Sequence, residues 1–167
     1  LFVQSCIEIL GKHPDFTAVV VGAISSSNED FVKELQDKVA QAGLSERIVF
    51  AGEQNFADIP TIFGALSLVV ALSDNEGFGL TILEAMSSGA AVLASEAGAW
   101  PEVVQEGSNC YVVAVNDLPA VVEKMDLLLS DPQKLSQMGA EGRERVLEHY
   151  SVQREAKQLV EFYRGLM

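Results

Sequence analysis

The apolar positions of the chain form short continuous runs that alternate with stretches of helical spacing. Five runs are bounded by glycine or polar residues and are mostly rich in valine. Such runs are typical of strands buried on both faces of a sheet. We expect these strands at residues 17–23, 48–51, 66–72, 90–94 and 111–115.

Helical patterns occupy the intervals between these runs. Phe31, Leu35 and Val39 keep helix spacing, and Ser27 or Asn28 is placed to act as the N-cap. Helices are also expected at residues 1–10, 80–87, 117–129, from Asp131-Pro132 onward and from Ser151 onward.

Alternating strands and helices predict an α/β fold, with a Rossmann-like doubly wound parallel sheet followed by C-terminal helices. We treat residues 1–167 as one domain, of which 117–167 is the helical part. The chain opens on a helix, whereas in a sheet of order 3-2-1-4-5-6 the strand before the first helix is central. We therefore expect the first central strand to be missing, and to be supplied by a segment upstream of Leu1 or by another chain.

Composition excludes several classes of partner. The 167 residues are 49% hydrophobic and 21% charged, as in an ordinary globular domain. The net charge of −13 argues against binding nucleic acid or an anionic membrane through bulk charge. No apolar run approaches the ~20 residues of a membrane span, so we expect no membrane insertion by this domain. Two cysteines, Cys6 and Cys110, fit a reducing, cytoplasmic compartment.

The negative charge is concentrated in one window. No lysine or arginine occurs from Ile48 to Glu123. Ligands of an open α/β sheet bind at the carboxyl ends of its strands, and three of those ends fall in this window. Its acids either form a soluble surface or include carboxylates that bind the hydroxyls of a neutral, polyol-like ligand. They are Glu53, Asp58, Asp74, Glu76, Glu84, Glu96, Glu102, Glu106, Asp117 and Glu123.

The segment SDNEGFGLTILEAM combines a strand end, a glycine loop and a helix start. Gly77 and Gly79 let the backbone approach a ligand closely. The amides of Leu80 and Thr81 lie in the first turn of the helix and, with the helix dipole, suit a phosphate. The carboxylate of Glu84 leans back toward the same place, and its two oxygens match a vicinal diol.

A plain surface helix or a standard nucleotide-binding motif fits this segment less well. An acid before a helix and another inside it can reflect dipole or surface chemistry alone, but the flanking glycines favour a site. A dinucleotide fingerprint would need a third glycine where Ile82 stands, and no GxxxxGK[ST] motif occurs.

The stretch EGFGLTILEAMSSGAAVLAS, which begins at Glu76, resembles the Glu-x7-Glu signature of retaining GT-B glycosyltransferases. The closest likeness is to glycosyltransferase family 4, the glycosyl transferases group 1. The likeness covers essentially the whole chain and corresponds to the C-terminal, donor-binding domain, so it implies that the N-terminal acceptor domain is absent. Further matching segments are Phe50-Ala51-Gly52, Gly98-x-x-Pro101-Glu102-Val103-Val104, Glu106-Gly107 and Tyr150-Ser151.

This resemblance implies a role for each residue of the motif. Glu84 would bind the ribose of a nucleoside-diphosphate sugar such as UDP- or GDP-hexose. Glu76 would be the catalytic residue that orients the hexose. The implied donor-binding residues are Gly77, Phe78, Gly79, Leu80, Thr81 and Glu84, with Gly52, Glu53 and Gln54 beside the base.

The resemblance also implies a reaction. A hexose would move to an acceptor hydroxyl with retained anomeric configuration, as in mannosyl transfer during lipopolysaccharide or other envelope polysaccharide biosynthesis. No cofactor or metal is implied, and no Asp-x-Asp pattern occurs. The missing domain would carry the protein to the inner face of the membrane, and the last helix would cross toward that domain.

One departure from the family limits the isolated chain. The Gly-Arg and Lys-Gly segment that clamps the diphosphate in the family is absent, so we expect weak nucleotide binding and no transfer by these residues alone.

Two alternatives to the transferase function remain open. One is a noncatalytic nucleotide-sugar binding module, and the other is a different GT-B enzyme, such as a sugar-nucleotide epimerase or sugar phosphate synthase. His13 and His149 lie far from the motif and are interpreted as surface or packing residues.

Overall fold

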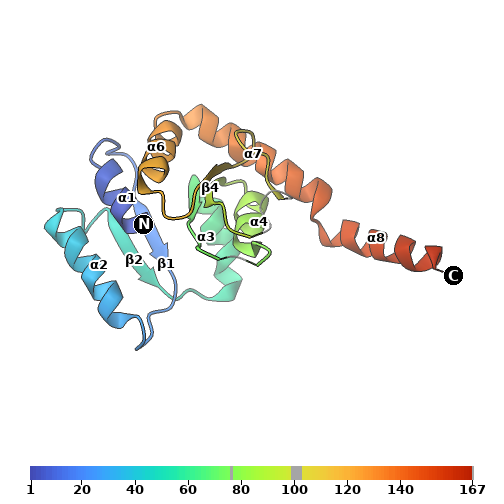
Figure 1. Cartoon of the computed structure of the whole chain (residues 1–167), viewed down its shortest axis with the longest axis horizontal. Coiled ribbons are helices and arrows are strands. Elements are labelled where there is room, and N and C mark those ends of the chain that lie inside the picture. Colours follow the sequence, from blue (N-terminus) through green and yellow to red (C-terminus); the bar gives the residue numbers. More distant parts are fainter. Residues whose placement is uncertain (76, 99–102, 167) are drawn as a thin grey trace.

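The computed structural model describes residues 1–75, 77–98 and 103–166 (Figure 1). The alternation of strands and helices is confirmed, and all five expected strands are present. The short helices η1 and α3 were not predicted. The elements are α1 (Phe2–Ile9), β1 (Ala18–Val21), α2 (Glu29–Gln41), β2 (Ile48–Gly52), the 3-10 helix η1 (Phe56–Asp58), α3 (Ile59–Ala65), β3 (Leu68–Ala71), α4 (Leu80–Ser87), β4 (Ala91–Ser95), β5 (Tyr111–Val113), α6 (Leu118–Leu129), α7 (Pro132–His149) and α8 (Val152–Gly165).

The described strands form two separate parallel sheets, β1–β2 and β3–β4–β5. β1 runs beside β2 with one register shift between Val20 and Val21, while β4 is flanked by β3 and β5. Figure 1 shows β1 and β2 near α1 and α2, with the three-stranded sheet toward α4 and α7. In a doubly wound sheet the first central strand would lie between β1 and β3. The expected gap in the middle of the sheet is therefore observed.

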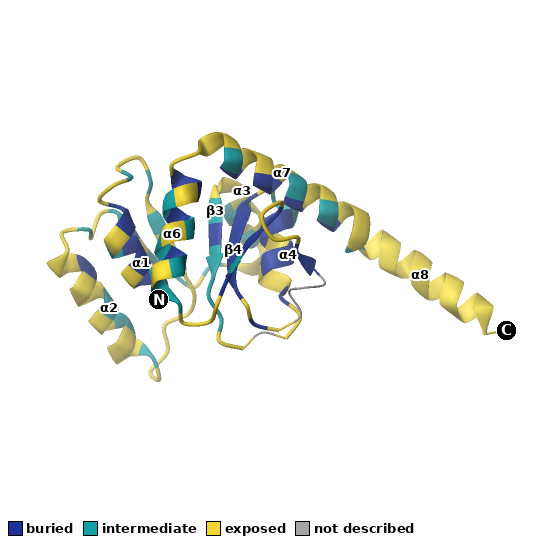
Figure 2. Ribbon diagram, turned by 45° about the horizontal axis from the view of Figure 1, so that its top comes forward, coloured by how far each residue is buried: buried dark blue, intermediate teal, exposed yellow. Residues whose placement is uncertain are grey.

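Two hydrophobic cores lie on opposite faces of the three-stranded sheet. Successive side chains of a strand point to opposite faces. Accordingly, Leu68 and Val70 join the core that contains α1 and α6, while Val69 and Ala71 join the core under α4 and α7. All five residues of β4 are buried, as Figure 2 shows in dark blue. The sheet is thus covered on both sides at β4.

β1 and β2 are less covered than their sequences predict. Val19, Val21 and Val49 are 37%, 40% and 41% exposed. The expectation that these two strands are buried on both faces is therefore wrong. The core under α4 and α7 extends only as far as β3, and α3 packs mainly on α4 and η1. One face of β1–β2 is consequently left open.

Helix α7 lies very close to α4, because two glycines of α7 have no side chain. A Cβ atom placed on Gly139 would lie 2.0 Å from the carbonyl oxygen of Gly89, and one on Gly142 would lie 3.3 Å from the side chain of Met86. Arg145 adds a hydrogen bond from its Nε to the Val103 carbonyl oxygen at 2.5 Å. The contact of Gly142 with Met86 places α7 directly against α4, whose N-terminus carries the predicted site.

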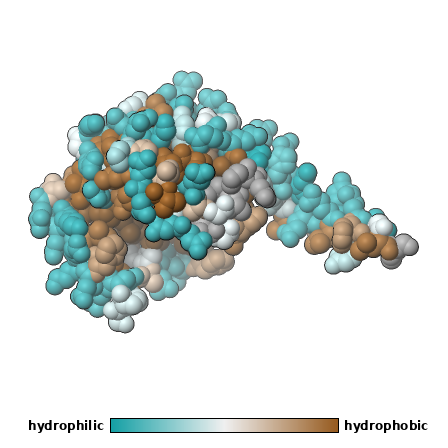
Figure 3. Space-filling model, viewed as in Figure 1, coloured by the Kyte–Doolittle hydropathy of each residue, from teal (hydrophilic) through white to brown (hydrophobic). Residues whose placement is uncertain are grey.

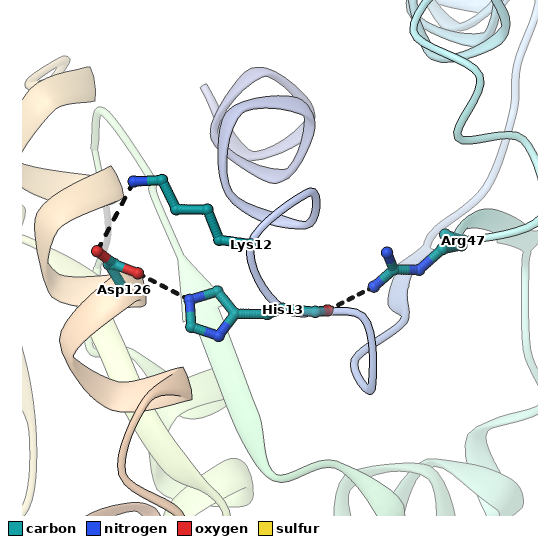
Figure 4. Close-up of polar contacts among 4 residues, drawn as sticks. All are labelled: Lys12, His13, Arg47 and Asp126. Carbon is teal, nitrogen blue, oxygen red and sulfur yellow. Dashed lines mark hydrogen bonds and ion pairs between the residues drawn. The ribbon is translucent and has the colours of Figure 1, made fainter.

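Polar contacts join the α1–β1 loop to both sides of the gap (Figure 4). The Nε2 atom of His13 lies 2.7 Å from Oδ1 of Asp126 in α6, and Lys12 forms a longer ion pair with the same carboxylate. Arg47, just before β2, donates to the carbonyl oxygens of Leu10 and His13. His13 is therefore a packing residue, as expected, and this loop links the two sheets.

Helix α8 extends away from the globular part of the chain (Figure 1). None of its described residues is buried, and Leu159, Phe162, Tyr163 and Leu166 are exposed apolar or aromatic side chains at its end. Within the described part of the chain, no helix combines the length and apolar character needed to cross a membrane.

Candidate functional site

The N-terminus of α4 presents backbone amides without a side-chain cap. Gly79 is the N-cap residue, with a left-handed φ of 86° that favours glycine. The amides of Ile82 and Leu83 both donate to the Gly79 carbonyl oxygen. The amides of Gly79, Leu80 and Thr81 precede Ile82, the first donor to this carbonyl oxygen, so they have no partner within the helix. This helix start can accept an anion, as the sequence predicts.

Glu84 lies one turn into α4 and is exposed. Its carbonyl oxygen accepts hydrogen bonds from the hydroxyls of Ser87 and Ser88. No described residue forms a hydrogen bond or ion pair with its carboxylate. The position fits recognition of a diol next to a bound phosphate.

The loop between β3 and α4 is anchored to the neighbouring strand. The hydroxyl of Ser95, at the end of β4, donates to the Ser73 carbonyl oxygen at 2.5 Å. Phe78 and Leu80 are 51% and 63% exposed. This hydrogen bond fixes the start of the loop. The side chains of Phe78 and Leu80 are exposed beside the N-terminus of α4.

The turn after β2 approaches the site from the other sheet. Gly52 adopts a left-handed φ of 67° where the register with β1 shifts, and its carbonyl oxygen accepts the Gly22 amide at 3.0 Å. The side-chain amide of Gln54 donates to the Ala51 carbonyl oxygen at 2.7 Å. The predicted base turn is thus held rigidly at the carboxyl ends of β1 and β2.

One cavity of about 870 Å³ brings the two halves of the predicted site together. Thr81 and Glu84 from α4 line it, together with Glu53 and Gln54 from the turn after β2. The cavity lies between the two sheets, where the strand order of a doubly wound sheet reverses. Ligands of such sheets bind at this switch point. Figure 3 shows hydrophobic atoms gathered around a hollow on this part of the surface.

The charge of the cavity lining is negative. Asp15, Glu53 and Glu84 contribute carboxylates, and the described lining includes no lysine or arginine. Within the described lining, a diphosphate can therefore interact favourably with backbone amides and with the helix dipole. The interaction of an anion with a helix N-terminus contributes roughly 0.3–1 kcal/mol at an exposed site. Positive charge would have to come from another segment.

Several predicted residues are not placed with these side chains. Glu76 and the Pro101-Glu102 pair lie outside the described residues. Val103 and Val104 are buried in the core, and the carboxylate of Glu106 accepts the Val112 amide at 2.6 Å. The Glu106-Gly107 part of the matched motif thus has a structural role here.

The sequence reasoning missed the α3 wall of the cavity. Ile59, Ile62 and Phe63 all line it, together with Phe56 of η1. Asp58 as the N-cap residue and Pro60 in the first turn were signals that could have located this helix. Among the described residues, no group of three or more His, Cys, Asp or Glu side chains gathers to hold a metal ion.

Known proteins similar to this chain include bacterial glycosyltransferases. The chain is 38% identical over 169 residues to a lipopolysaccharide core biosynthesis mannosyltransferase, LpsB, of Rhizobium meliloti (strain 1021). That alignment covers the whole chain but 48% of the relative, so the chain spans about half the length of the curated protein that it matches.

Solved structures share the fold. The C-terminal domain of the group 1 family glycosyl transferase LpcC from Francisella tularensis superposes with a TM-score of 0.86 at 41% identity, covering 90% of this chain and 78% of that one. Anabaena Alr3699/HepE, solved in complex with UDP, gives 0.86 at 27% identity, covering 98% of this chain and 44% of that one.

A family model agrees with these likenesses. Residues 1–145 match the model described as glycosyl transferases group 1, which leaves only the end of α7 and α8 outside the match. Together with the α/β fold of split parallel sheets, this match shows that the chain belongs to the glycosyl transferases group 1 family.

Proposed function

We propose that this chain is the donor-binding domain of a retaining glycosyltransferase that moves a hexose from a nucleoside-diphosphate sugar to an acceptor hydroxyl. One observation carries the proposal. Thr81 from the first turn of α4, Glu84 one turn later and the Glu53-Gln54 turn all line one cavity at the switch point of the sheet. A phosphate, a diol and a flat base could each find a partner there.

Each proposed contact follows from the chemistry of its group. The amides of Gly79, Leu80 and Thr81 bind the diphosphate, and the Glu84 carboxylate accepts hydrogen bonds from both ribose hydroxyls. The Gly52-Glu53-Gln54 turn borders the base. Gly77, Phe78 and the catalytic Glu76 hold the hexose and orient its anomeric carbon.

The names of the similar proteins support a sugar class. The Rhizobium relative is a mannosyltransferase of lipopolysaccharide core synthesis, and the Anabaena structure holds UDP. We propose mannose, or a related hexose, as the transferred sugar and an envelope polysaccharide or lipopolysaccharide as the product. The reaction uses no metal or cofactor in this proposal, and it takes place on the cytoplasmic side of the membrane.

Helix α8 is the proposed contact with an acceptor domain. Its side chains Leu159, Phe162, Tyr163 and Leu166 are apolar or aromatic, and within the described part of the chain they stay exposed. Docking of α8 on the acceptor domain would bury that surface and bring the acceptor hydroxyl over the donor site.

Donor binding by the 167-residue chain tests the site. UDP-glucose, GDP-mannose and an ADP-sugar are titrated while thermal unfolding is followed, with the wild type, Glu84→Gln and Glu144→Gln compared. Glu144 is an exposed glutamate of α7 that does not line the cavity, so it is the matched control. Loss of charged hydrogen bonds worth about 1.5–3 kcal/mol should weaken binding roughly tenfold or more in Glu84→Gln alone.

Transfer is tested in a protein that carries both domains, with a donor labelled in its sugar. Glu84→Ala should mainly raise the donor KM, and Glu76→Ala should lower kcat as well. Label found in an epimerised nucleotide sugar or a sugar phosphate, or binding without any product, would replace this proposal by one of the alternatives. Equal donor affinity of the wild type, Glu84→Gln and Glu144→Gln would show that Glu84 does not bind the donor.

A further inference from the structure

The turn after β2 carries one polar side chain that has no partner among the described residues. Glu53 is exposed, and no described residue forms a hydrogen bond or ion pair with its carboxylate. The side-chain amide of Gln54 donates to the Ala51 carbonyl oxygen at 2.7 Å. The side-chain amide of Asn55 donates to the Asp58 carboxylate at 3.3 Å. Within the described part of this turn, Glu53 is therefore the side chain available to recognise a ligand.

The three carboxylates of the described cavity lining lie in different places. Asp15 precedes β1, toward the amino ends of the strands. Glu84 belongs to α4, where the proposed function assigns it to the ribose. Glu53 follows β2, at the carboxyl ends of β1 and β2 and on their side of the cavity. A nucleoside whose ribose is bound by Glu84 therefore has Glu53 as the acidic partner for its base.

A carboxylate discriminates between bases through their hydrogen-bonding edges. An ionised carboxylate offers two acceptor oxygens and no donor. Guanine presents two adjacent donors, N1–H and the 2-amino group, which match these two oxygens. Uracil presents N3–H between two carbonyl oxygens, and adenine presents its 6-amino group beside the acceptor N1. With either of these two bases, one carboxylate oxygen accepts a hydrogen bond while the other faces an acceptor and is repelled.

The rest of the lining does not offset this preference. Within the described lining there is no lysine or arginine side chain to bind the two carbonyl oxygens of uracil. Phe56 is 88% exposed and lines the same cavity three residues after Glu53, so its ring is available for stacking. Stacking on an aromatic ring tolerates every base. Discrimination between bases is therefore left to contacts at the base edge.

We propose that Glu53 selects a guanosine-diphosphate sugar as the donor, by accepting hydrogen bonds from N1–H and the 2-amino group of guanine. This inference rests on the function proposed above and names the nucleotide that the same site takes. Hydrogen bonds to an ionised group are stronger than neutral ones. A base that lacks the matching donors leaves the carboxylate unpaired, which is how a polar site rejects a near relative of its substrate.

Nucleoside diphosphates compare the bases while the ribose and the diphosphate stay constant. GDP, inosine diphosphate (IDP), UDP and ADP are titrated into the 167-residue chain, and chemical-shift changes give each dissociation constant. IDP lacks only the 2-amino group of GDP, so this pair tests one hydrogen bond without any variant. We expect GDP to bind about tenfold more tightly than IDP, and at least tenfold more tightly than UDP or ADP.

Three variants assign the preference to one carboxylate. Glu53→Gln should reduce the ratio of GDP to IDP affinity to about threefold or less, because it removes the charge and one acceptor. Glu46→Gln is the matched control, since Glu46 is exposed just before β2 and does not line the cavity, and it should keep the wild-type ratios. Glu84→Gln should weaken all four nucleotides alike and keep the preference for GDP.

The outcomes separate this inference from the proposed function. Equal affinity of the wild type for GDP, IDP and UDP would overturn the inference, and so would an unchanged preference for GDP in Glu53→Gln. Neither result would affect the donor site itself. If the chain alone binds too weakly to titrate, kcat/KM for GDP- and UDP-sugars is compared in a protein that carries both domains. Failure of that protein to use or bind any nucleotide sugar would overturn the proposed donor site, and this inference with it.

Discussion

The two sheets of this domain are built from similar sequences but are buried to different degrees. β1 reads Ala-Val-Val-Val and β4 reads Ala-Val-Leu-Ala-Ser, yet β4 is buried at every residue, whereas the residues of β1 alternate between half-buried and exposed. The difference comes from the neighbours. β4 has a strand on each side and a core on each face, whereas β1 has one paired edge and one open face.

The candidate site depends on the gap between these two sheets. Glu53 and Gln54 belong to the β1–β2 side of the cavity, and Thr81 and Glu84 belong to the other side. The described contacts across the gap include the His13–Asp126 pair and the packing of α1 against α6. Donor contacts made from both sides therefore need the two sheets held at a fixed separation.

Matched valine truncations should show the largest difference. Val92 of β4 is 0% exposed and Val19 of β1 is 37% exposed. Val92→Ala should lower the free energy of unfolding by about 2–3 kcal/mol, because it removes buried methyl groups and leaves a cavity. Val19→Ala should cost about 1 kcal/mol or less, since its side chain is partly solvated already. Urea unfolding measures both, and equal losses would contradict the open face of β1.

Glycine substitutions compare the close helix contact with an open one. Gly139→Ala forces a methyl group against the Gly89 carbonyl oxygen, where α7 and α4 cover the three-stranded sheet. Overpacking of this kind should cost about 1–3 kcal/mol. Gly64→Ala in α3 meets no atom within 4 Å and should be neutral or stabilising by up to about 1 kcal/mol. A Gly139→Ala variant as stable as Gly64→Ala would show that α7 can move away without cost.

The two buried thiols make the stability of each half of the domain depend on pH, which can be measured. Burial raises the pKa of Cys6 in α1 and that of Cys110 beside β5 to about 12. Above pH 9 the thiols ionise in the unfolded chain but not in the folded one, so the folded state binds more protons and its stability falls from pH 9 to 12. Cys6→Ala and Cys110→Ala should each remove about 1 kcal/mol of this loss at about pH 10. Urea midpoints at about pH 8 and about pH 10 that shift equally in the wild type and the double variant would rule out this effect.

The loop contact should show the smallest effect. Asp126→Asn breaks the pair with His13 that links the α1–β1 loop to α6, and should cost about 1 kcal/mol or less because the carboxylate is 42% exposed. Glu123→Gln, which alters an exposed pair on the same helix, is the control and should change stability little. If the two variants are equally stable in urea, this pair does not hold the halves together.

The sequence predicted the strands well because burial leaves a strong apolar signal. The run at residues 90–94 differs from the observed β4 by one residue at each end. The α3 helix escaped because seven residues contain too few helical turns to display a period. The sequence overpredicted the burial of Val19 and Val21. An apolar sequence indicates that a strand can pack against an apolar neighbour, but not that such a neighbour is present.

Part of the candidate site also followed from sequence. The position of Gly79 at a helix start and of Glu84 one turn later depends on local spacing, so it was predictable. That Glu53 and Thr81 line one cavity was expected only through the family resemblance. The contact of Gly139 with Gly89 joins residues 50 positions apart, and no local pattern indicates it.

Amide exchange within single strands of the 167-residue chain tests the split sheet most directly. The amide of Val20 points toward β2, whereas those of Val19 and Val21 point away from it into the cavity, so each residue has its control beside it. We expect Val19 and Val21 to exchange at least about tenfold faster than Val20, and Leu68 and Val70 faster than Val69, since unpaired amides lack protection. Equal protection of neighbouring residues along β1 and β3 would contradict the unpaired edges of these strands and with them the separation of the two sheets.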